Sequence, residues 1–174
     1  ASVVPSLAAD DQLLVSLKRL FSQVVNTVAV LRTIPPDATR TMTTKCHTNV
    51  TAGGGMHFYA VTGAAPGTYV HNNGTIIVPT GGDGSAAWLA IHSGILTPRR
   101  FGAIGDGVAV DLPALQAMFT VAIANKIPVN LESGNYLINA RIDVTGGSDL
   151  YVYGAGINNT KITTNSATAD VFYS

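Results

Sequence analysis

Apolar residues recur every three or four positions near the N-terminus of the chain. Leu14, Leu17, Phe21 and Val24 follow this spacing, and polar side chains occupy positions between them. The pattern predicts a helix over residues 9–26 with one apolar seam. Parallel coiled coils bury such a seam, although an amphipathic helix packed on its own domain has the same spacing. Residues 28–32 are rich in β-branched side chains, so we expect the helix to give way to a strand there.

Short strand-like segments fill the next part of the chain. Val, Ile, Thr and aromatic residues gather in residues 41–51, 56–61, 75–79 and 87–91, and glycine-rich or Asn-Gly turns separate these segments. Such turn-rich spacing predicts an antiparallel meander or a small barrel. We therefore expect residues 28–96 to form a small antiparallel β-domain, followed by a neck near residues 94–100.

A glycine-laced turn then leads into a second helix. Gly102, Gly105 and Gly107 permit a positive φ, and Asp106 can hydrogen-bond its own turn. Asp111 is the expected helix N-cap, and Pro113 falls in the first turn, where its missing N–H costs nothing. The helix that follows carries one apolar stripe, made by Leu112, Leu115, Phe119, Ala122 and Ile123.

Closely spaced short strands follow this second helix. Apolar segments occur at residues 127–131, 136–138, 142–144, 150–153, 161–163 and 171–173, with glycine-containing turns among them. This spacing favours a coiled β-solenoid over a sandwich of longer strands. A solenoid begins with unpaired strand edges and an open apolar core, so we expect the amphipathic helix to cover the first coil.

Residues 97–174 resemble the start of the right-handed parallel β-helix in the pectate-lyase-like superfamily, as found in bacteriophage tailspikes and polysaccharide depolymerases. The resemblance rests on Phe101-Gly102-Ala103-x-Gly105-Asp106-Gly107, on Asp111, Ala114 and Gln116, on Gly134-x-Tyr136, and on Gly154-x-Gly156 with Thr160-Lys161-Ile162. The β-helix cap that we expect comprises Phe101, Gly102, Gly105, Asp106, Gly107, Asp111, Leu115 and Phe119.

The preceding part of the chain resembles the small domain that comes before the β-helix in many phage tailspikes. The residues concerned are Leu31-Arg32-Thr33, the triple glycine before His57-Phe58-Tyr59, the Asn-Gly turn before Ile76-Ile77-Val78-Pro79, and Ala87-Trp88-Leu89. In that family the small domain belongs to the virion-proximal part of the spike. We therefore expect an N-terminal helical segment at residues 1–27. The resemblance implies a virion-proximal β-domain at 28–96, followed by a neck, a capping helix and the start of the β-helix at 97–174.

Charge and composition narrow the partners of the chain. Of 174 residues, 47% are apolar and 11% are charged, with ten basic and ten acidic side chains. Nucleic acid and anionic membrane surfaces are bound by clustered Lys and Arg, which this chain lacks, so we expect neither partner. No apolar run is long enough to cross a bilayer, and membrane insertion is not expected. A low charge suits an assembly whose surfaces are covered by partners.

Reactive side chains form no convincing site in the sequence. Cys46 is expected to be a small buried residue, and Tyr59 and Trp88 are expected in the core, with a sugar-stacking platform as the alternative. His47, His57, His71 and His92 lack ligand spacing, so we expect no metal, and no Lys follows the glycine turn, so we expect no phosphate-binding cofactor. The carboxylates Asp106, Asp111, Glu132, Asp143, Asp149 and Asp170 are scattered, and we place no catalytic residue in the chain.

The resemblance implies a structural attachment module of a phage tailspike, located in the virion tail. We expect a homotrimer with its seam at Leu14, Leu17, Phe21 and Val24, docked on a tail or baseplate protein. Host surface polysaccharide would be bound through a β-helix that we expect to continue past Ser174. The alternatives are a polysaccharide depolymerase, lyase or glycoside hydrolase, acting on capsule or O-antigen, and a carbohydrate-binding module that uses Tyr59 and Trp88.

Overall fold

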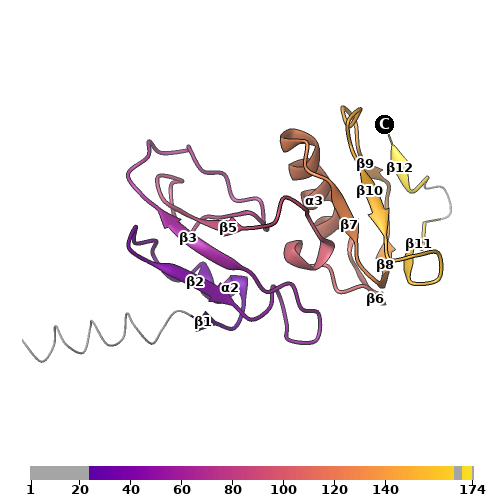
Figure 1. The fold of residues 1–174 in the computed structure, drawn as a ribbon, viewed down its shortest axis with the longest axis horizontal. Helices are drawn as coiled ribbons and strands as arrows, with labels where there is room; N and C mark the ends of the chain where they lie inside the picture. Colours follow the sequence, from indigo (N-terminus) through magenta and orange to yellow (C-terminus); the bar gives the residue numbers. More distant parts are fainter. Residues whose placement is uncertain (1–23, 167–169, 174) are drawn as a thin grey trace, which may run out of the picture.

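The computed structural model describes residues 24–166 and 170–173. Its first part is a five-stranded sheet of order β1-β2-β3-β5-β4 (Figure 1). Strands β2, β3, β5 and β4 pair antiparallel, and β1 pairs parallel with β2 at the edge. These strands are β1 (Val24–Val25), β2 (Thr41–Thr44), β3 (His57–Val61), β4 (Ile76–Ile77) and β5 (Ala87–Ile91).

The sheet has one buried face. Along β3 the side chains of Phe58 and Ala60 are buried while those of His57 and Tyr59 are exposed, as the alternation of a strand requires. Trp88 of β5 is fully buried, and its indole Nε1 donates to the Ile34 carbonyl at 3.0 Å. One apolar cluster thus joins the inner face of the sheet to the segments that cover it.

Two predictions near the start of this sheet are wrong. Residues 24 and 25 form strand β1 rather than the end of a helix, and residues 28–31 form the short helix α2 (Val28–Leu31) rather than a strand. Thr27 is the N-cap of α2, and its Oγ1 accepts from the Val30 N–H at 3.2 Å. Burial explains both differences, because the strand and the helix each place apolar side chains, Val25, Val28 and Leu31, in the core beneath the sheet. The sheet thus begins before the expected boundary at residue 28.

A tight connection joins the sheet to α3 (Leu112–Asn125). It contains the 3-10 helix η1 (Pro98–Phe101), which ends at Gly102 with a φ of 100°, and strand β6 (Asp106–Val110). As expected, Pro113 lies in the first turn of α3. The helix ends at Lys126, whose φ is 55°.

Short parallel strand pairs follow α3. Strand β7 (Val129–Leu131) pairs with β10 (Val152–Gly154), β8 (Gly134–Ile138) with β11 (Thr160–Thr164), and β9 (Ile142–Asp143) with β12 (Phe172–Tyr173). Partners lie roughly 25 residues apart in the chain, which is a typical length for one solenoid repeat. We call α3 and β6–β12 the coil region. Strand β6 adds to the edge of β8.

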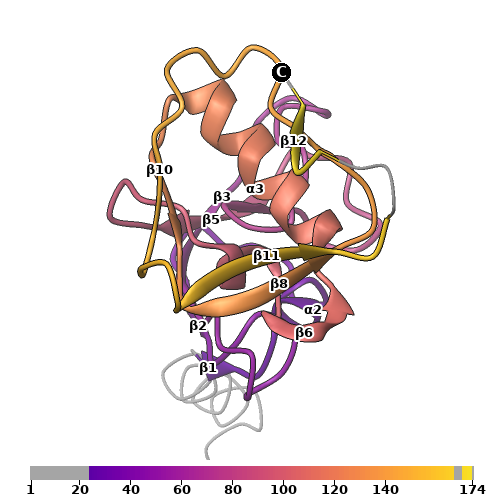
Figure 2. The same cartoon turned by 90° about the vertical axis from the view of Figure 1, so that its right-hand side faces the viewer.

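Helix α3 lies across the coil region on the side that faces the five-stranded sheet (Figures 1 and 2). Leu115, Met118 and Phe119 are fully buried and share one cluster with Tyr136 and Ile138 of β8. The Gln116 amide also holds α3 to β9, because its Nε2 donates to the Asp143 carbonyl at 2.9 Å and its Oε1 accepts from the Asp143 N–H at 2.8 Å. None of the described helices is long and apolar enough to cross a membrane.

Candidate functional site

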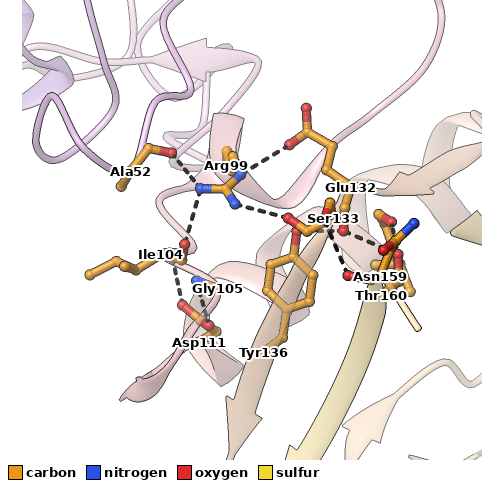
Figure 3. Close-up of polar contacts among 11 residues, drawn as sticks. Ala52, Arg99, Ile104, Gly105, Asp111, Glu132, Ser133, Tyr136, Asn159 and Thr160 are labelled. Carbon is orange, nitrogen blue, oxygen red and sulfur yellow. Dashed lines mark hydrogen bonds and ion pairs between the residues drawn. The ribbon is translucent and has the colours of Figure 1, made fainter. Parts of the chain in front are cut away.

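Polar side chains from several elements meet where the five-stranded sheet adjoins the coil region. Figure 3 shows Arg99, Asp111 and Tyr136 converging there from η1, the start of α3 and β8. We call this place the junction. Its components come from segments far apart in sequence, so the fold alone assembles it.

Arg99 connects three segments at the junction. Its Nη1 donates to the carbonyls of Ala52 at 2.9 Å and Ile104 at 3.1 Å, and its Nη2 donates to the Ser133 carbonyl at 2.9 Å (Figure 3). Its Nε lies 3.8 Å from Glu132 Oε2, a buried oxygen that has no hydrogen-bond partner among the described residues. A planar guanidinium can serve several carbonyls at once in a way that an ammonium cannot.

Asp111 occupies the N-cap position of α3 that the sequence predicts, but its side chain does not cap the helix. Its side chain makes no capping hydrogen bond, and its carboxylate instead accepts from the backbone N–H groups of Ile104 at 2.7 Å and Gly105 at 3.0 Å. The side chain is buried, so it needs these donors to compensate for lost water. The glycine turn approaches closely enough to supply both of them. Asp111 therefore fixes the turn against the start of the helix.

Asp106 acts as the sequence predicts. Its Oδ1 accepts from the N–H groups of Val108 at 2.8 Å and Ala109 at 2.9 Å, and these bonds hold the pKa of the carboxyl below its ordinary value. Gly102, Gly105 and Gly107 all adopt positive φ. At Gly105 an added Cβ would lie 3.0 Å from the Tyr136 ring, so the close packing there also requires glycine.

Tyr136 is the buried aromatic residue of the junction. Its ring is fully buried in the cluster that contains Phe101, Leu115 and Phe119, and its hydroxyl donates to the Glu132 carbonyl at 3.1 Å. Burial raises the pKa of Tyr136 to about 12. The phenol thus stays protonated, as a hydrogen-bond donor must. The structure thus places the members of the predicted cap at one location, and their capping role stays a prediction.

A second contact joins the sheet to the connection through His47. The buried His47 ring donates from Nε2 to the Asn73 carbonyl at 2.7 Å, which leaves Nδ1 to accept from Thr48 Oγ1 at 3.0 Å. Asn73 Nδ2 donates in turn to the Phe101 carbonyl at 3.2 Å. Burial lowers the pKa of His47, and the hydrogen bond to Asn73 offsets part of that effect. The lowered pKa favours the neutral ring.

The remaining candidate residues lie apart from the junction. Cys46 is buried as predicted, and Trp88 is a core residue as predicted, but Tyr59 is 42% exposed, so its expected core position is wrong. His57 Nδ1 contacts Thr43 Oγ1 at 2.8 Å, and His92 Nδ1 accepts from the Gly94 N–H. In the described parts of the chain, no three His, Cys, Asp or Glu side chains gather to hold a metal ion.

The predicted trimer seam is described at one position only. Leu14, Leu17 and Phe21 lie outside the described residues. Val24 lies in β1, where its side chain is 54% exposed. It is therefore available to a partner, although from a strand and not from a helix.

Sequence reasoning missed Arg99, Asn73 and Tyr136 as junction residues. A signal existed for Arg99, because Arg99 and Arg100 are adjacent basic residues in a chain that is only 11% charged. Two of the three backbone carbonyls that Arg99 binds, those of Ala52 and Ser133, lie in remote segments, and no residue type marks those positions. The interaction becomes visible only in three dimensions.

Comparison with known proteins gives a consistent result. Residues 24–93 match the family described as phage tail protein small four-stranded beta-sheet domain. No curated protein sequence matches the chain. The family match begins at β1 and covers the whole five-stranded sheet.

Solved structures share the fold of the sheet and of the coil region. Tailspike protein 2 of the Escherichia coli O157:H7 bacteriophage CAB120 has 24% identity and a TM-score of 0.68, with 96% of this chain and 21% of that chain covered. Pantoea stewartii WceF, described as a glycan biofilm modifying enzyme with a tailspike-like parallel beta-helix fold, has 20% identity and a TM-score of 0.67, with 86% and 23% covered.

A third similar structure is the tailspike gp49 of the Acinetobacter baumannii bacteriophage Fri1, described as a capsular polysaccharide depolymerase. It has 20% identity and a TM-score of 0.62, with 77% of this chain and 23% of that chain covered. The chain spans less than a quarter of the length of these three structures. Residues 24–93 thus match a phage tail β-sheet domain, and the fold of the chain is similar to the N-terminal fifth to quarter of these three structures.

Proposed function

We propose that this chain is the structural attachment module of its tailspike. In this role it trimerises, docks on a tail or baseplate protein, and holds a β-helix that engages host surface polysaccharide. The observation that carries the proposal is the match of residues 24–93 to a phage tail domain, with the coil region following directly along the chain.

The coil region is, in this proposal, the start of a right-handed parallel β-helix with α3 as its cap. Three parallel pairs at solenoid spacing support the β-helix, and the buried stripe of α3 against β8 supports the cap. Segments 1–27, 28–96 and 97–174 would then serve as trimer seam, virion-proximal domain and β-helix start. Hydrogen bonds from Arg99 to Ala52 and from Asn73 to Phe101 join the last two segments and support this arrangement.

Two measurements on the 174-residue chain test the proposal. Sedimentation equilibrium should give three times the mass of one chain, and a strictly monomeric species at high concentration would contradict trimerisation. Incubation with capsular or O-antigen polysaccharide should release no oligosaccharide, which gel filtration of the glycan would show.

The second candidate function is a polysaccharide depolymerase, a lyase or a glycoside hydrolase. It is favoured by the printed descriptions of WceF as a glycan-modifying enzyme and gp49 as a depolymerase. In this case the active site of the full-length protein would lie beyond residue 174. Cleavage of the polysaccharide by the 174-residue chain alone would overturn the attachment proposal for this segment.

A further inference from the structure

A pocket of about 320 Å³ opens beside the short helix α2 and the edge strand β4 of the five-stranded sheet. Arg32, which follows α2, forms one side of it. Residues 69–71, which come before β4, and most of the turn 78–84, which follows β4, form the rest. The three glycines of this turn contribute only backbone to the wall, so no side chain of theirs fills the space. We call this place the Arg32 pocket.

Arg32 carries the positive charge of the pocket. Its Nε donates to the Val78 carbonyl at 3.1 Å, and its own carbonyl accepts from the Thr80 N–H at 2.9 Å, so the residue is held against the turn. Among the residues that the structure describes, no carboxylate forms an ion pair with this half-buried guanidinium, and no acceptor binds its Nη groups. A guanidinium presents its N–H donors in a planar fork, and those on the Nη atoms are left for a ligand.

His71 lines the same pocket, and its ring is incompletely bonded. Nδ1 is buried and has no hydrogen-bond partner in the described parts of the chain. Buried polar atoms are normally satisfied by the protein, by water or by an ion, so the chain alone leaves this place unserved. Burial lowers the pKa of His71 and the charge of Arg32 lowers it further, whereas Ile76 and Asn73 oppose part of this effect. At neutral pH the ring is therefore uncharged, and Arg32 is the cation that a ligand meets.

We propose that the Arg32 pocket binds a single carboxylate group, which accepts from the Nη donors of Arg32. The planar fork of a guanidinium matches the two oxygens of a carboxylate. The pocket is at the small end of ligand pockets, which hold about 300–1,000 Å³, so it suits a group the size of one amino acid or one sugar. Such binding would be a function beyond attachment, and it does not depend on trimerisation.

Asp83 explains why the ligand should carry one negative charge and not two. This exposed residue lies at the rim of the pocket, and hydrogen bonds from Ser85 hold the pKa of its carboxyl below its ordinary value. Asp83 is therefore ionised at neutral pH, and it repels a dianion about twice as strongly as it repels a carboxylate. Inorganic phosphate is for this reason the poorer match.

Nuclear magnetic resonance of the 174-residue chain, titrated with sodium acetate at constant ionic strength, tests the proposal. We expect saturable shifts of the Arg32 Nε–H signal and of the His71 ring signals, because both side chains line the pocket. The pKa of His71 should rise in acetate, because a negative charge beside the ring favours its protonated form. His92 lies outside the pocket, and its ring signals should not respond. The absence of any saturable response at Arg32 and His71 would overturn the proposal.

Arg32→Gln removes the guanidinium and should raise the acetate concentration at half-saturation at least about tenfold. Arg40→Gln is the matched control, because Arg40 is also half-buried, precedes β2 of the same sheet and lies outside the pocket. It should leave acetate binding unchanged. The near-ultraviolet circular dichroism of the buried Trp88 reports whether each variant is folded. A folded Arg32→Gln variant that binds acetate as tightly as the unchanged chain would overturn the proposal.

Val70→Glu tests the pocket without altering Arg32. Val70 is 71% exposed at the pocket wall, so a polar side chain there should leave the fold intact, and a carboxylate would compete with acetate for the guanidinium. Val70→Gln is the neutral control, and we expect weaker acetate binding in Val70→Glu alone. Should Arg32→Gln fail to fold, equal acetate binding by the two Val70 variants would overturn the proposal.

Two pairs of probes identify the source of the carboxylate. N-acetylalanine against N-acetylalaninamide represents the free end of a peptide chain, and glucuronate against glucose represents an acidic sugar. We expect the acid of at least one pair to bind at least about tenfold more tightly than its neutral counterpart, and the tighter acid names the source. Equal binding of acid and neutral probes in both pairs, or tighter binding of inorganic phosphate than of acetate, would overturn the assignment to a carboxylate. None of these outcomes bears on trimerisation or on glycan cleavage, which test the attachment role separately.

Discussion

The five-stranded sheet and the coil region bury apolar side chains in opposite ways. In the sheet, most strands pair antiparallel, and a single inner face packs against loops and α2. In the coil region, every strand pair is parallel and joins residues about 25 positions apart. The sheet buries its apolar side chains against segments of its own region. A coil of a solenoid buries them only when a neighbouring coil or a cap packs against each of its two ends.

This difference determines which surfaces each region leaves open. Helix α3 covers the coil region on the side that faces the sheet. Strands β10, β11 and β12 line an open cavity of about 600 Å³, which Val152, Ile162 and Phe172 border. The sheet instead leaves one face exposed, on which Tyr59 and Ile91 are 42% and 57% exposed. A solenoid gains further contacts when another coil stacks along its axis. A sheet with an exposed apolar face gains them when another molecule packs on that face.

Removing a large buried aromatic side chain from each region should produce the largest effects. Trp88→Ala and Phe119→Ala should each lower the free energy of unfolding by about 3–5 kcal/mol, through lost burial and an unfilled cavity. Hydrogen exchange should show faster exchange mainly in β2, β3 and β5 for Trp88→Ala and mainly in β7, β8 and β9 for Phe119→Ala. Equal loss of protection in both regions for either variant would show that the two cores unfold as one unit.

Glycine 54 offers a sharper test of the junction. An added Cβ would lie 1.8 Å from the Arg99 carbonyl oxygen, so Gly54→Ala forces the backbone segments of sheet and connection apart. Gly63→Ala is the matched control, because Gly63 has a similar positive φ and nothing within 4 Å of an added Cβ. We expect Gly54→Ala to cost about 1–3 kcal/mol more than Gly63→Ala, measured by urea denaturation. An equal loss of stability in the two variants would mean that the positive φ, and not the close approach to Arg99, accounts for the cost of Gly54→Ala.

The guanidinium of Arg99 should contribute less than either core. Arg99→Lys removes hydrogen bonds to Ala52, Ile104 and Ser133 but keeps the charge, and should cost about 1–3 kcal/mol. Arg100→Lys is the control, since Arg100 makes one long bond of 3.4 Å to the Ile95 carbonyl. Calorimetry should show the sheet and the coil region unfolding at more widely separated temperatures in Arg99→Lys alone. An unchanged thermogram would rule out coupling through Arg99.

The smallest effect should come from pH. Burial lowers the pKa of His47 and of His71 in the folded chain, so protonation favours the unfolded state. The contribution of these two neutral histidines to the free energy of unfolding should be complete above the pKa of an unfolded histidine, about 6.5. It should be lost as the pH falls through the lower pKa values that the two side chains have in the folded chain. Urea denaturation at a series of pH values from 8 to 5 measures this. His47→Gln should flatten the profile over this range, and an unchanged slope would assign the effect to other groups.

Several features of the fold could be predicted from local patterns. The strands around Phe58 and Trp88, the glycine turn at Asp106 and the position of Pro113 follow from alternation, turn chemistry and helix geometry. Each of these patterns acts within a few residues of chain. Residues 24–93 match a small β-sheet domain of phage tail proteins, and the virion-proximal position of residues 28–96 stays a prediction.

Other features could not be predicted because they depend on remote partners. Val28–Leu31 is helical despite its β-branched residues, since its apolar side chains reach the core beneath the sheet from a helix. Asp111 has the residue type of an N-cap, yet its carboxylate binds a turn that folds back onto it. Tyr59 has the composition of a core residue, and only the pairing register assigns it to the exposed face of the sheet.

The sequence by itself determined helix α3, most of the strands and their order, because turn residues and apolar periodicity act over short distances. Tertiary structure alone decided the junction, where Arg99 donates to the carbonyls of Ala52 and Ser133, which lie 47 and 34 residues away in the chain. It also decided which face of the sheet is left exposed, because a register of one residue more or less would exchange the two faces.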